Sequence, residues 1–363
     1  MKVLHVGEYV KGGVATYIKE IIDFQSNSDR VDEVYLMLSK NNSEKQLNIQ
    51  NNNIIFYDYR RKPKYVLRAI LEINKSINHI KPDVIHVHST FAGLYTRIPF
   101  FLKKNRPKIV YCSHGWSFLM DIKQYKKIIF ATIEYLLSLK TDLIINISNN
   151  EQEKSLQFKL PKNKSRVIYN GINEIEKNDE IDISVDNSKI NLLFVGRFDR
   201  QKGLDILLKY FSNYNNNKIN LYVAGSGVLG NQEIIIPENV INLGWIDNTK
   251  IDAYYKMFDA VIIPSRWEGF GLVAIEAMKN KKAVIVSNRG ALPELVQDGV
   301  NGYVFDLDDM KSLEKVFNTI NKEDLVDFGE NGYKIFKDKF TSKIMNKQII
   351  NTYITLFDNN KKY

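Results

Sequence analysis

The sequence contains one cysteine, Cys112, among 363 residues. A single cysteine excludes a disulfide bond within the chain and is typical of proteins of reducing compartments. Cys112 ends the apolar run 109–112, so we expect a buried thiol and not a nucleophile. No run reaches about 18 apolar residues, and residues 1–6 indicate a core strand rather than a signal peptide. These absences predict a cytoplasmic protein.

Acidic residues are scarce only in the first half of the chain. Residues 1–175 hold 27 Lys and Arg against 16 Asp and Glu, a net charge of +11, whereas the remainder holds 24 against 26 and carries −2. A basic half suits nucleic acid or an anionic membrane surface. No helix-turn-helix, zinc-finger or RNP motif accompanies it, which argues against nucleic acid. We expect the apolar segment 128–137 to be a core-packed helix rather than a membrane-inserting one. A peripheral contact of the basic half with the anionic inner face of the membrane remains a hypothesis.

Length and pattern together predict two domains. Short strands rich in Val and Ile alternate with helical patterns, stop in the polar and acidic stretch 173–189, and then resume. Such alternation predicts an α/β protein in which two parallel sheets are covered by helices. The expected strands are residues 2–6, 33–38, 84–88, 108–113 and 143–147, and then 189–195, 220–224, 240–243, 260–263 and 283–286.

Two glutamates frame the junction that follows the expected strand 260–263. Glu268 lies in the turn, and Glu276 lies on an apolar helix expected to begin near Gly271. A carboxylate on an apolar helix needs a partner, because burying an unpaired charge is costly. The glycines and the free N–H groups at the helix N-terminus would admit an anionic ligand. An isolated pair of this kind is usually structural, so its meaning depends on other motifs.

A second junction carries two cations. Arg197 follows the expected strand 189–195, and Lys202 stands at the start of the next helix. A guanidinium fork and an ammonium group at a helix N-terminus suit a diphosphate. Together with the two glutamates, they predict a site for a nucleotide sugar.

Two further motifs have simpler interpretations. Residues 225–230 match the dinucleotide fingerprint G-x-G-x-x-G, but Pro237 argues against the long helix that this motif should open. We therefore expect a tight turn facing a phosphate or nucleoside, not an NAD site. Asp306 and Asp308 form an Asp-x-Asp motif just before a helix expected near Met310, so helix capping explains them better than a metal.

The chain resembles glycosyltransferase family 4, whose members are retaining sugar transferases of the GT-B fold. The resemblance covers roughly residues 1–305 and rests on the order and spacing of motifs that are individually weak. These motifs are Gly12-Gly13-Val14, residues 83–88, His114-Gly115, Ile147-Ser148, Tyr169-Asn170-Gly171, Gly196-Arg197 to Lys202-Gly203, residues 224–227, Leu243-Gly244-Trp245, the block 268–276, and residues 290–302. One departure follows the Glu276 helix, where residues 280–283 replace the usual Gly and Pro, so the local turn is expected to differ.

The resemblance implies two Rossmann-like parallel-sheet domains that face a central cleft. Residues 1–175 would bind the acceptor and residues 176–340 the nucleotide sugar. The C-terminal helix within 341–363 would cross back to the first domain.

The resemblance also implies roles for particular residues. The expected catalytic residues are Glu268, His114, Arg197 and Lys202, of which the two cations would hold the diphosphate. The expected donor-binding residues are Gly12, Gly13, Arg197, Lys202, Gly225, Ile246, Glu268, Phe270, Gly271, Leu272 and Glu276, with Glu276 on the ribose. His88 and Asn170 would line the acceptor side. We expect His86 and His88 to point to alternate sides or ends of their strand.

The implied function is retaining transfer of a sugar from a nucleotide sugar, expected to be a UDP-sugar, to a saccharide or polyprenyl-linked acceptor. No other cofactor and no metal are expected, because the two cations would offset the diphosphate charge. Assembly of a capsule, exopolysaccharide or O-antigen is the expected setting. The alternatives are a nucleotide-sugar epimerase of the same fold and a non-catalytic nucleotide-sugar-binding protein. The complete set of Arg197, Lys202, Glu268 and Glu276 argues against the last.

Overall fold

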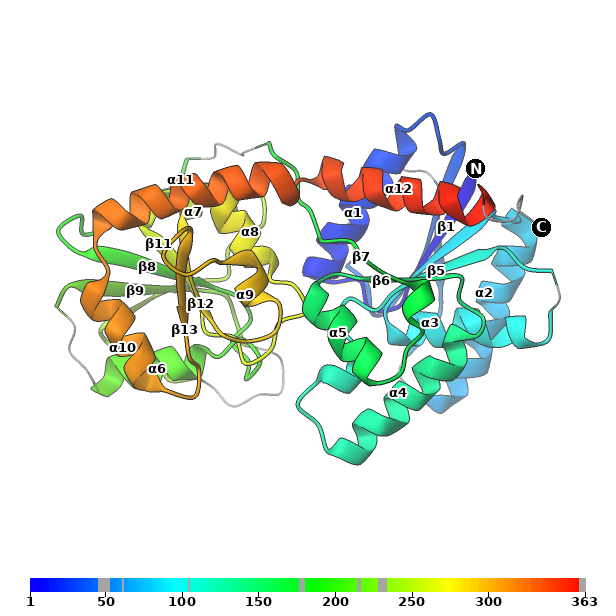
Figure 1. The fold of residues 1–363 in the computed structure, drawn as a ribbon, viewed down its shortest axis with the longest axis horizontal. Coiled ribbons are helices and arrows are strands. Elements are labelled where there is room, and N and C mark those ends of the chain that lie inside the picture. The colour runs from blue at the N-terminus through cyan, green and yellow to red at the C-terminus, as the bar shows by residue number, and fades with distance from the viewer. Residues whose placement is uncertain are drawn as a thin grey trace. The chain divides into compact units, whose positions relative to one another are not determined.

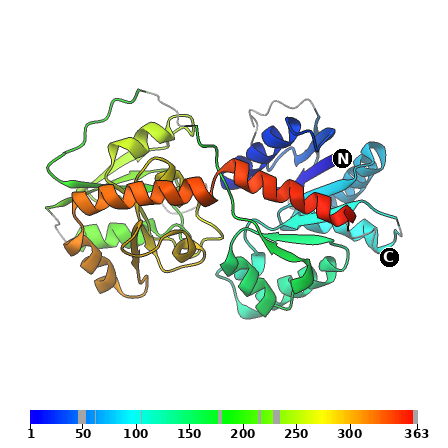
Figure 2. The same ribbon diagram turned by 45° about the horizontal axis from the view of Figure 1, so that its top comes forward.

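The computed structural model divides into two compact units, residues 1–173 with 342–363, and residues 174–341 (Figures 1 and 2). The residues it describes are 1–44, 53–60, 62–103, 105–175, 180–213, 217–227 and 234–358. In each unit a parallel sheet is covered by helices, the arrangement that the alternating pattern predicts.

The sheet of the first unit has seven parallel strands in the order β3-β2-β1-β4-β5-β6-β7. Its central strands are buried along nearly their whole length because helices cover both faces, and they are mostly apolar, with buried histidines in β1 and β4. The strands are β1 (Lys2–Gly7), β2 (Glu33–Ser39), β3 (Ile54–Tyr57), β4 (Val84–His88), β5 (Lys108–Cys112), β6 (Leu143–Asn146) and β7 (Ser165–Val167).

Among the described residues of this unit, six helices and four short 3-10 turns accompany the sheet. The helices are α1 (Gly13–Ser26), α2 (Val66–Ile80), α3 (Thr90–Arg97), α4 (Gln124–Ser138), α5 (Asn149–Gln157) and α12 (Ser342–Asp358), and the turns are η1 (Pro63–Tyr65), η2 (Ile98–Phe101), η3 (Ser117–Leu119) and η4 (Lys162–Lys164). The last helix, α12, lies beside α1 in both views of the fold. Its Tyr353 is fully buried and accepts a hydrogen bond from Nε2 of Gln25 in α1 at 3.4 Å. The C-terminal segment is therefore part of the first unit.

The sheet of the second unit has six parallel strands in the order β10-β9-β8-β11-β12-β13. The strands are β8 (Ile190–Val195), β9 (Ile219–Ala224), β10 (Val240–Gly244), β11 (Ala260–Ile263), β12 (Ala283–Ser287) and β13 (Gly302–Phe305). The helices are α6 (Leu204–Asn213), α7 (Ile251–Met257), α8 (Leu272–Lys279), α9 (Leu292–Leu295), α10 (Met310–Thr319) and α11 (Lys322–Lys339).

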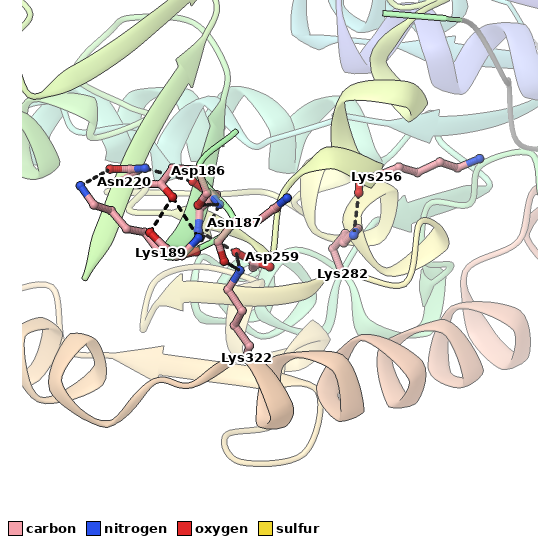
Figure 3. Close-up of polar contacts among 10 residues, drawn as sticks. Asp186, Asn187, Lys189, Asn220, Lys256, Asp259, Lys282 and Lys322 are labelled. Carbon is pink, nitrogen blue, oxygen red and sulfur yellow. Dashed lines mark hydrogen bonds and ion pairs between the residues drawn. The ribbon is translucent and has the colours of Figure 1, made fainter. Parts of the chain in front are cut away.

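Polar contacts hold the segment that leads into β8 (Figure 3). Lys322 Nζ donates to the carbonyl of Asn187 at 3.0 Å and lies 3.5 Å from Oδ2 of Asp259. The same Asp259 oxygen accepts the backbone N–H of Asn191 at 2.7 Å. The first strand of this unit is thereby fixed to α11 and to the loop before β11.

All ten strands expected from the sequence form, with bounds that differ by no more than one residue at either end. Three further strands, β3, β7 and β13, were not expected from the sequence, and they have only three or four residues each. None of the three is fully buried, so none shows the continuous apolar run of the central strands.

The expectation for residues 128–137 is only half right. They do form a helix, α4, but in this segment only Ala131, Glu134 and Leu137 are buried. The large apolar side chains of its outer face are exposed, so only the inner face of α4 packs on the core. Among the described residues, no helix is long and apolar enough to cross a membrane.

Strand order fixes where each sheet can bind a ligand. In the second unit the chain proceeds from β8 towards β10 and then returns to β11 on the other side of β8. The first unit reverses in the same way between β1 and β4. In open parallel sheets, ligands bind at such switch points, beyond the carboxyl ends of the strands.

Candidate functional site

The switch point of the second unit gathers the expected donor residues. Arg197 follows β8, Gly225 follows β9, Ile246 follows β10 and Glu268 follows β11. These four strands are neighbours in one parallel sheet, so their carboxyl ends meet at one edge. Residues spread over some 70 positions of sequence are thus brought to a common edge by topology alone.

An ion pair between Lys202 and Glu268 bridges the loops after β8 and β11. Oε1 of Glu268 also accepts from the hydroxyl of Ser265 at 3.0 Å. Gln201 adds a second link between the loops, because its Nε2 donates to the carbonyl of Trp267 at 3.2 Å. The side chains of Lys202 and Glu268 are 19% and 8% exposed, so the pair is largely shielded yet open at one side.

Arg197 is much more open, with a side chain that is 54% exposed. Its Nη2 lies 3.0 Å from Oδ2 of Asp199 and 3.0 Å from Oε1 of Gln201. A guanidinium offers five N–H donors, so two contacts leave capacity for a phosphate. Asp199 also accepts the backbone N–H of Lys202 at 3.0 Å, which fixes the turn that presents both cations.

Glu276 has the partner that its apolar helix requires. The hydroxyl of Tyr255, on α7, donates to Oε2 of Glu276 at 2.8 Å. Withdrawal from solvent raises the pKa of Glu276, while the bond from Tyr255 and the charge of Lys279 act in the opposite direction. The sequence analysis missed Tyr255, because nothing in the α7 sequence indicates which α8 residue it faces.

The loop that carries Glu268 depends on two glycines. Gly271 has φ +106° and is the N-cap residue of α8. Gly290 has φ +58°, and a Cβ atom added there would lie 2.1 Å from the carbonyl oxygen of Glu268. The side chain of Phe270 is buried against Phe340, with ring centroids 5.8 Å apart. Phe270 can therefore offer a ligand only its backbone, whereas Leu272 begins α8 and is half-buried.

The loops after β9 and β10 are in contact with the same edge. The N–H of Gly225 donates to the carbonyl of Gly244 at 2.8 Å, and a Cβ atom on Gly225 would lie 1.9 Å from the carbonyl oxygen of Gly196. Ile246 is half-buried in the loop after β10. The fingerprint continues through residues 228–230, which lie outside the described residues.

In the first unit, the loop between β1 and α1 carries Gly12 and Gly13. Both are exposed, and Gly12 has φ +55° with open space where a Cβ atom would stand. The N–H of Gly12 donates to Oε1 of Glu44 at 2.8 Å. The turn before α1 is therefore open to solvent and already in contact with one carboxylate oxygen.

His114, which follows β5, ends a row of hydrogen-bonded histidines. Its Nε2 lies 3.0 Å from Nδ1 of His88, whose Nε2 lies 3.0 Å from Nδ1 of His5. Nε2 of His5 in turn lies 2.9 Å from Oε1 of Gln25. The row arises because β1 and β4 pair in register, with His5 opposite His86 and Gly7 opposite His88.

The amide of Gln25 determines which nitrogen of each ring in this row carries the hydrogen. Its Oε1 can only accept, so Nε2 of His5 donates and Nδ1 of His5 accepts from His88. The same logic makes Nδ1 of His88 accept from Nε2 of His114. Nδ1 of His114 is then without a hydrogen and lies 3.6 Å from Sγ of Cys112, the buried thiol expected from the sequence.

Burial keeps this row neutral. It lowers the pKa of His5 to about 4 and that of His114 to about 3, and it lowers the pKa of His86 and His88 well below the usual value. His5, His86 and His88 bring ring nitrogens within 4.8 Å of one another. His5 and His88 share a hydrogen bond, and the pairing of β1 with β4 places His86 opposite His5.

Three expectations about the first unit need correction or refinement. His86 and His88 do not point to alternate sides, since residues two apart in a strand share a face and their ring centroids lie 4.2 Å apart. His88 is fully buried and touches His114, so it cannot itself meet an acceptor in this structure. Asn170 is also buried, and its side-chain oxygen has no hydrogen-bond partner among the described residues.

Helix capping does occur beside the Asp-x-Asp motif, but neither Asp306 nor Asp308 provides it. The side chain of Asp309 caps α10 by accepting the N–H of Lys311 at 3.0 Å. Oδ1 of Asp306 accepts from Asn288 at 3.0 Å, and Asp308 pairs with Arg289.

Comparisons with known proteins agree with this geometry. The chain matches the model of Glycosyltransferase Family 4 over residues 11–175 and that of Glycosyl transferases group 1 over residues 175–335. An uncharacterized 41.2 kDa protein in the cps region of Klebsiella pneumoniae is 33% identical, over 98% of this chain and 99% of its own. An uncharacterized glycosyltransferase of Methanocaldococcus jannaschii, MJ1178, is 30% identical over 71% of each chain.

Solved structures share the fold. HepE of Anabaena in complex with UDP-glucose aligns with a TM-score of 0.79 at 19% identity, over 98% of this chain and 100% of its own. Sucrose-phosphate synthase from Thermosynechococcus elongatus aligns with a TM-score of 0.79 at 17% identity, over 99% and 100%. Two parallel-sheet units, their neighbours of the GT-B fold and the two matching family models lead to one conclusion: this chain belongs to the group 1 and family 4 glycosyltransferases, and it is a glycosyltransferase enzyme.

Proposed function

We propose that this enzyme transfers a sugar, with retention of configuration, from a UDP-sugar to a saccharide or polyprenyl-linked acceptor during assembly of a bacterial surface polysaccharide. The observation that carries the proposal is the Lys202–Glu268 pair at the switch point between β8 and β11. It supplies a cation for a diphosphate and a carboxylate for sugar hydroxyls within one contact.

Names of related proteins support the setting. CapM of Staphylococcus aureus, a capsular polysaccharide biosynthesis glycosyltransferase, is 27% identical over 80% of each chain. An Escherichia coli galactosyltransferase named for UDP-Gal and a GlcNAc-diphosphoundecaprenol acceptor is 25% identical over 70% of this chain and 73% of its own. The proposal places the chain in the cytoplasm, at the inner face of the membrane, which suits its single cysteine.

In the second unit, Arg197 and Lys202 hold the diphosphate of the donor. Cations fixed where negative charge develops stabilise the departing nucleoside diphosphate in the transition state. The free N–H groups at the start of α8 lie in the loop that follows Glu268 and bind the same anion. The carboxylate of Glu276, oriented by Tyr255, accepts from the ribose hydroxyls.

In the first unit, His114 contacts the donor sugar and the exposed Gly12–Gly13 turn approaches the phosphates. The buried His88 holds the ring of His114 in place through the hydrogen bond between its Nδ1 and Nε2 of His114. The acceptor hydroxyl attacks from the face that the diphosphate leaves, and the leaving phosphate takes its proton. Glu268 serves sugar hydroxyls rather than forming a glycosyl adduct, so the proposal excludes the double displacement of retaining glycosidases.

Donor binding is the first test. We expect a thermal-shift screen of UDP-, GDP- and dTDP-sugars to favour a UDP-sugar, with about 2.7 kcal/mol of stabilisation at 100 times the Kd. The double variant Arg197→Ala/Lys202→Ala should bind that donor at least 100-fold more weakly, because each charged contact contributes about 1.5–3 kcal/mol. Lys281→Ala is the matched control, since Lys281 pairs with Glu330 on the surface of the same unit and should leave affinity unchanged.

Transfer itself is the second test. Glu268→Ala should abolish transfer to a saccharide acceptor, while EDTA should leave wild-type turnover intact. Unchanged transfer by Glu268→Ala, loss of turnover in EDTA, or a trapped glycosyl-glutamate would each contradict the proposed site chemistry. Conversion of the donor without an acceptor product would favour the epimerase instead.

A further inference from the structure

The outer face of α4 is apolar where a surface helix is normally polar. Its exposed large side chains are between 38% and 56% accessible to solvent. They are Tyr125, Ile128, Ile129, Ile133, Tyr135, Leu136 and, just beyond the helix, Leu139. We call these seven residues the docking face.

The inner face of the same helix carries the charge. Glu134 is buried, pairs with Arg97 at 2.7 Å and accepts from the hydroxyl of Tyr111 at 2.9 Å. The guanidinium of Arg97 lies 3.8 Å from the centroid of the Tyr111 ring. α4 is thus held to α3 and β5 by a polar anchor beside its buried Ala131 and Leu137, and it is apolar on its outer face as well. None of the seven residues of the docking face belongs to the hydrophobic core of the unit.

Lysines border the docking face. Lys123 and Lys126 are exposed, Lys127 is half-buried, and Lys140 directly follows Leu139. Nζ of Lys140 lies 5.5 Å from the ring of Phe101, which is itself exposed in η2. The apolar surface therefore continues from α4 towards η2, and cations stand at both ends of the helix.

We propose that the docking face lies in the interface of an anionic lipid bilayer, with its apolar side chains among the upper acyl chains and the lysines at the headgroups. Helices that bind membrane surfaces combine a broad apolar face with basic residues and interfacial aromatics, here Tyr125 and Tyr135. A second copy of the chain suits this surface less well. A two-fold symmetric contact through the same face would bring the lysines of both copies together.

This inference deepens the proposed function and rests on it for its meaning, because a polyprenyl-linked acceptor is held at a membrane. Binding to lipid and binding to donor are nevertheless measured separately. A protein that binds vesicles but no nucleotide sugar would contradict the proposed function alone. One that binds a nucleotide sugar but no vesicles would contradict the docking face alone.

The test is sedimentation of the full chain with vesicles of phosphatidylglycerol and phosphatidylethanolamine, compared with vesicles of phosphatidylcholine. Wild type should bind the anionic vesicles at least tenfold more tightly, and 0.5 M salt should weaken that binding. Ile129→Asn/Leu136→Asn should bind them more than tenfold more weakly. Lys126→Gln/Lys127→Gln should bind them about 30-fold more weakly, since each lysine near an anionic surface contributes about a factor of five.

The control variant is Val326→Asn/Met310→Asn, which changes two exposed apolar residues on helices of the second unit. It should bind anionic vesicles as wild type does. Donor binding by the Asn pair on α4 should equal that of wild type, which shows that the variant is folded. Equal wild-type binding to both kinds of vesicle would overturn the inference. So would unimpaired binding by the Asn pair, or a dimer in solution that this pair dissociates.

Discussion

Glu276, the proposed ribose ligand, is a half-buried side chain whose titration would link donor binding to pH. Its carboxylate is withdrawn from water, so its pKa lies above the ordinary glutamate value even with Tyr255 donating to it. Protonation turns one carboxylate oxygen into a donor and removes the charge that strengthens hydrogen bonds from ribose hydroxyls. A carboxylate with a raised pKa is protonated at a higher pH and should therefore lose its ligand at a higher pH.

We expect donor affinity to fall on acidification at a higher pH than an ordinary glutamate would cause. In Tyr255→Phe the decline should begin at a still higher pH, and affinity at neutral pH should fall about 10-fold, as for the loss of one charge-assisted bond. Calorimetric titration of the donor from pH 5 to pH 8 measures both effects. Glu276→Gln is the control, because it should bind weakly with a flatter pH profile. A profile as steep as that of wild type in Glu276→Gln would assign the titration to another group.

Gly290 should prove more sensitive to a methyl group than Gly299, although both have positive φ, +58° and +71°. A Cβ atom at Gly290 would collide with the backbone of Glu268, whereas one at Gly299 would meet nothing within 4 Å. Gly299→Ala should lose about 1 kcal/mol of stability from backbone strain alone, with transfer intact. Gly290→Ala should lose more than this and most of its transfer activity, as followed by thermal unfolding and initial rates. Equal losses in the two variants would show that the loop tolerates the displacement.

The sequence locates residues better than it locates their contacts. Glu268, Arg197 and Lys202 could be placed at one site because strand ends and glycines mark their turns. The histidine row could not, because it depends on the register between β1 and β4 and on Gln25, twenty residues away from His5. Such pairings leave no periodic signal.

At the scale of elements, strands were easier to predict than the packing of helices. Central strands are mostly apolar over their whole length, and such runs can be recognised directly in the sequence. The apolar content of α4 suggested burial, but apolar content alone does not say which side of a helix faces the core. The decisive signal was its single acidic residue, Glu134, which a buried arginine holds on the inner side.

Tyr353 connects α12 to the rest of the first unit through one hydroxyl. It accepts from Gln25 and lies 2.6 Å from Nδ1 of His86. Tyr353→Phe should destabilise this unit by about 1–3 kcal/mol, since two buried polar groups lose a partner. Urea unfolding followed by Trp116 fluorescence, in a Trp245→Phe/Trp267→Phe background, reports this unit specifically. Tyr135→Phe, at an exposed position, should have no effect, and a Tyr353→Phe midpoint equal to it would contradict the assigned role.

At the scale of the whole molecule, two units with separate cores were foreseeable from length and from the repeated alternation. Their chemistry differs in a way that composition does not reveal. The first unit buries a row of neutral histidines, whereas the second buries paired carboxylates and lysines, such as Asp252 with Lys279 at 2.7 Å. The two units should therefore respond differently to acid.

We expect the first unit to lose stability as pH falls from 6.5 to 4. An unfolded histidine takes up a proton near pH 6.5, but His5 in the folded state does so only near pH 4, so the unfolded state binds more protons in this window. His5 alone should remove about 2 kcal/mol at pH 5, and His86 and His88 add to that loss. Glu20, whose pKa burial raises, offsets part of it. Trp116-monitored unfolding at pH 7 and pH 5 measures the change, and His79→Gln, at an exposed position, should leave it unaltered. A first unit equally stable at both values would contradict the neutral row.

Because Gln25 ends the histidine row, its carboxamide decides what His114 presents at its other nitrogen. Three rings linked head to tail have only two concerted arrangements of their mobile hydrogens. Rotating the amide by 180° would reverse the direction of each of these hydrogen bonds. Nδ1 of His114 would then carry a hydrogen and donate it, instead of accepting one. Gln25 in helix α1 therefore determines, three hydrogen bonds away, whether Nδ1 of His114 donates to the buried thiol of Cys112 or accepts from it.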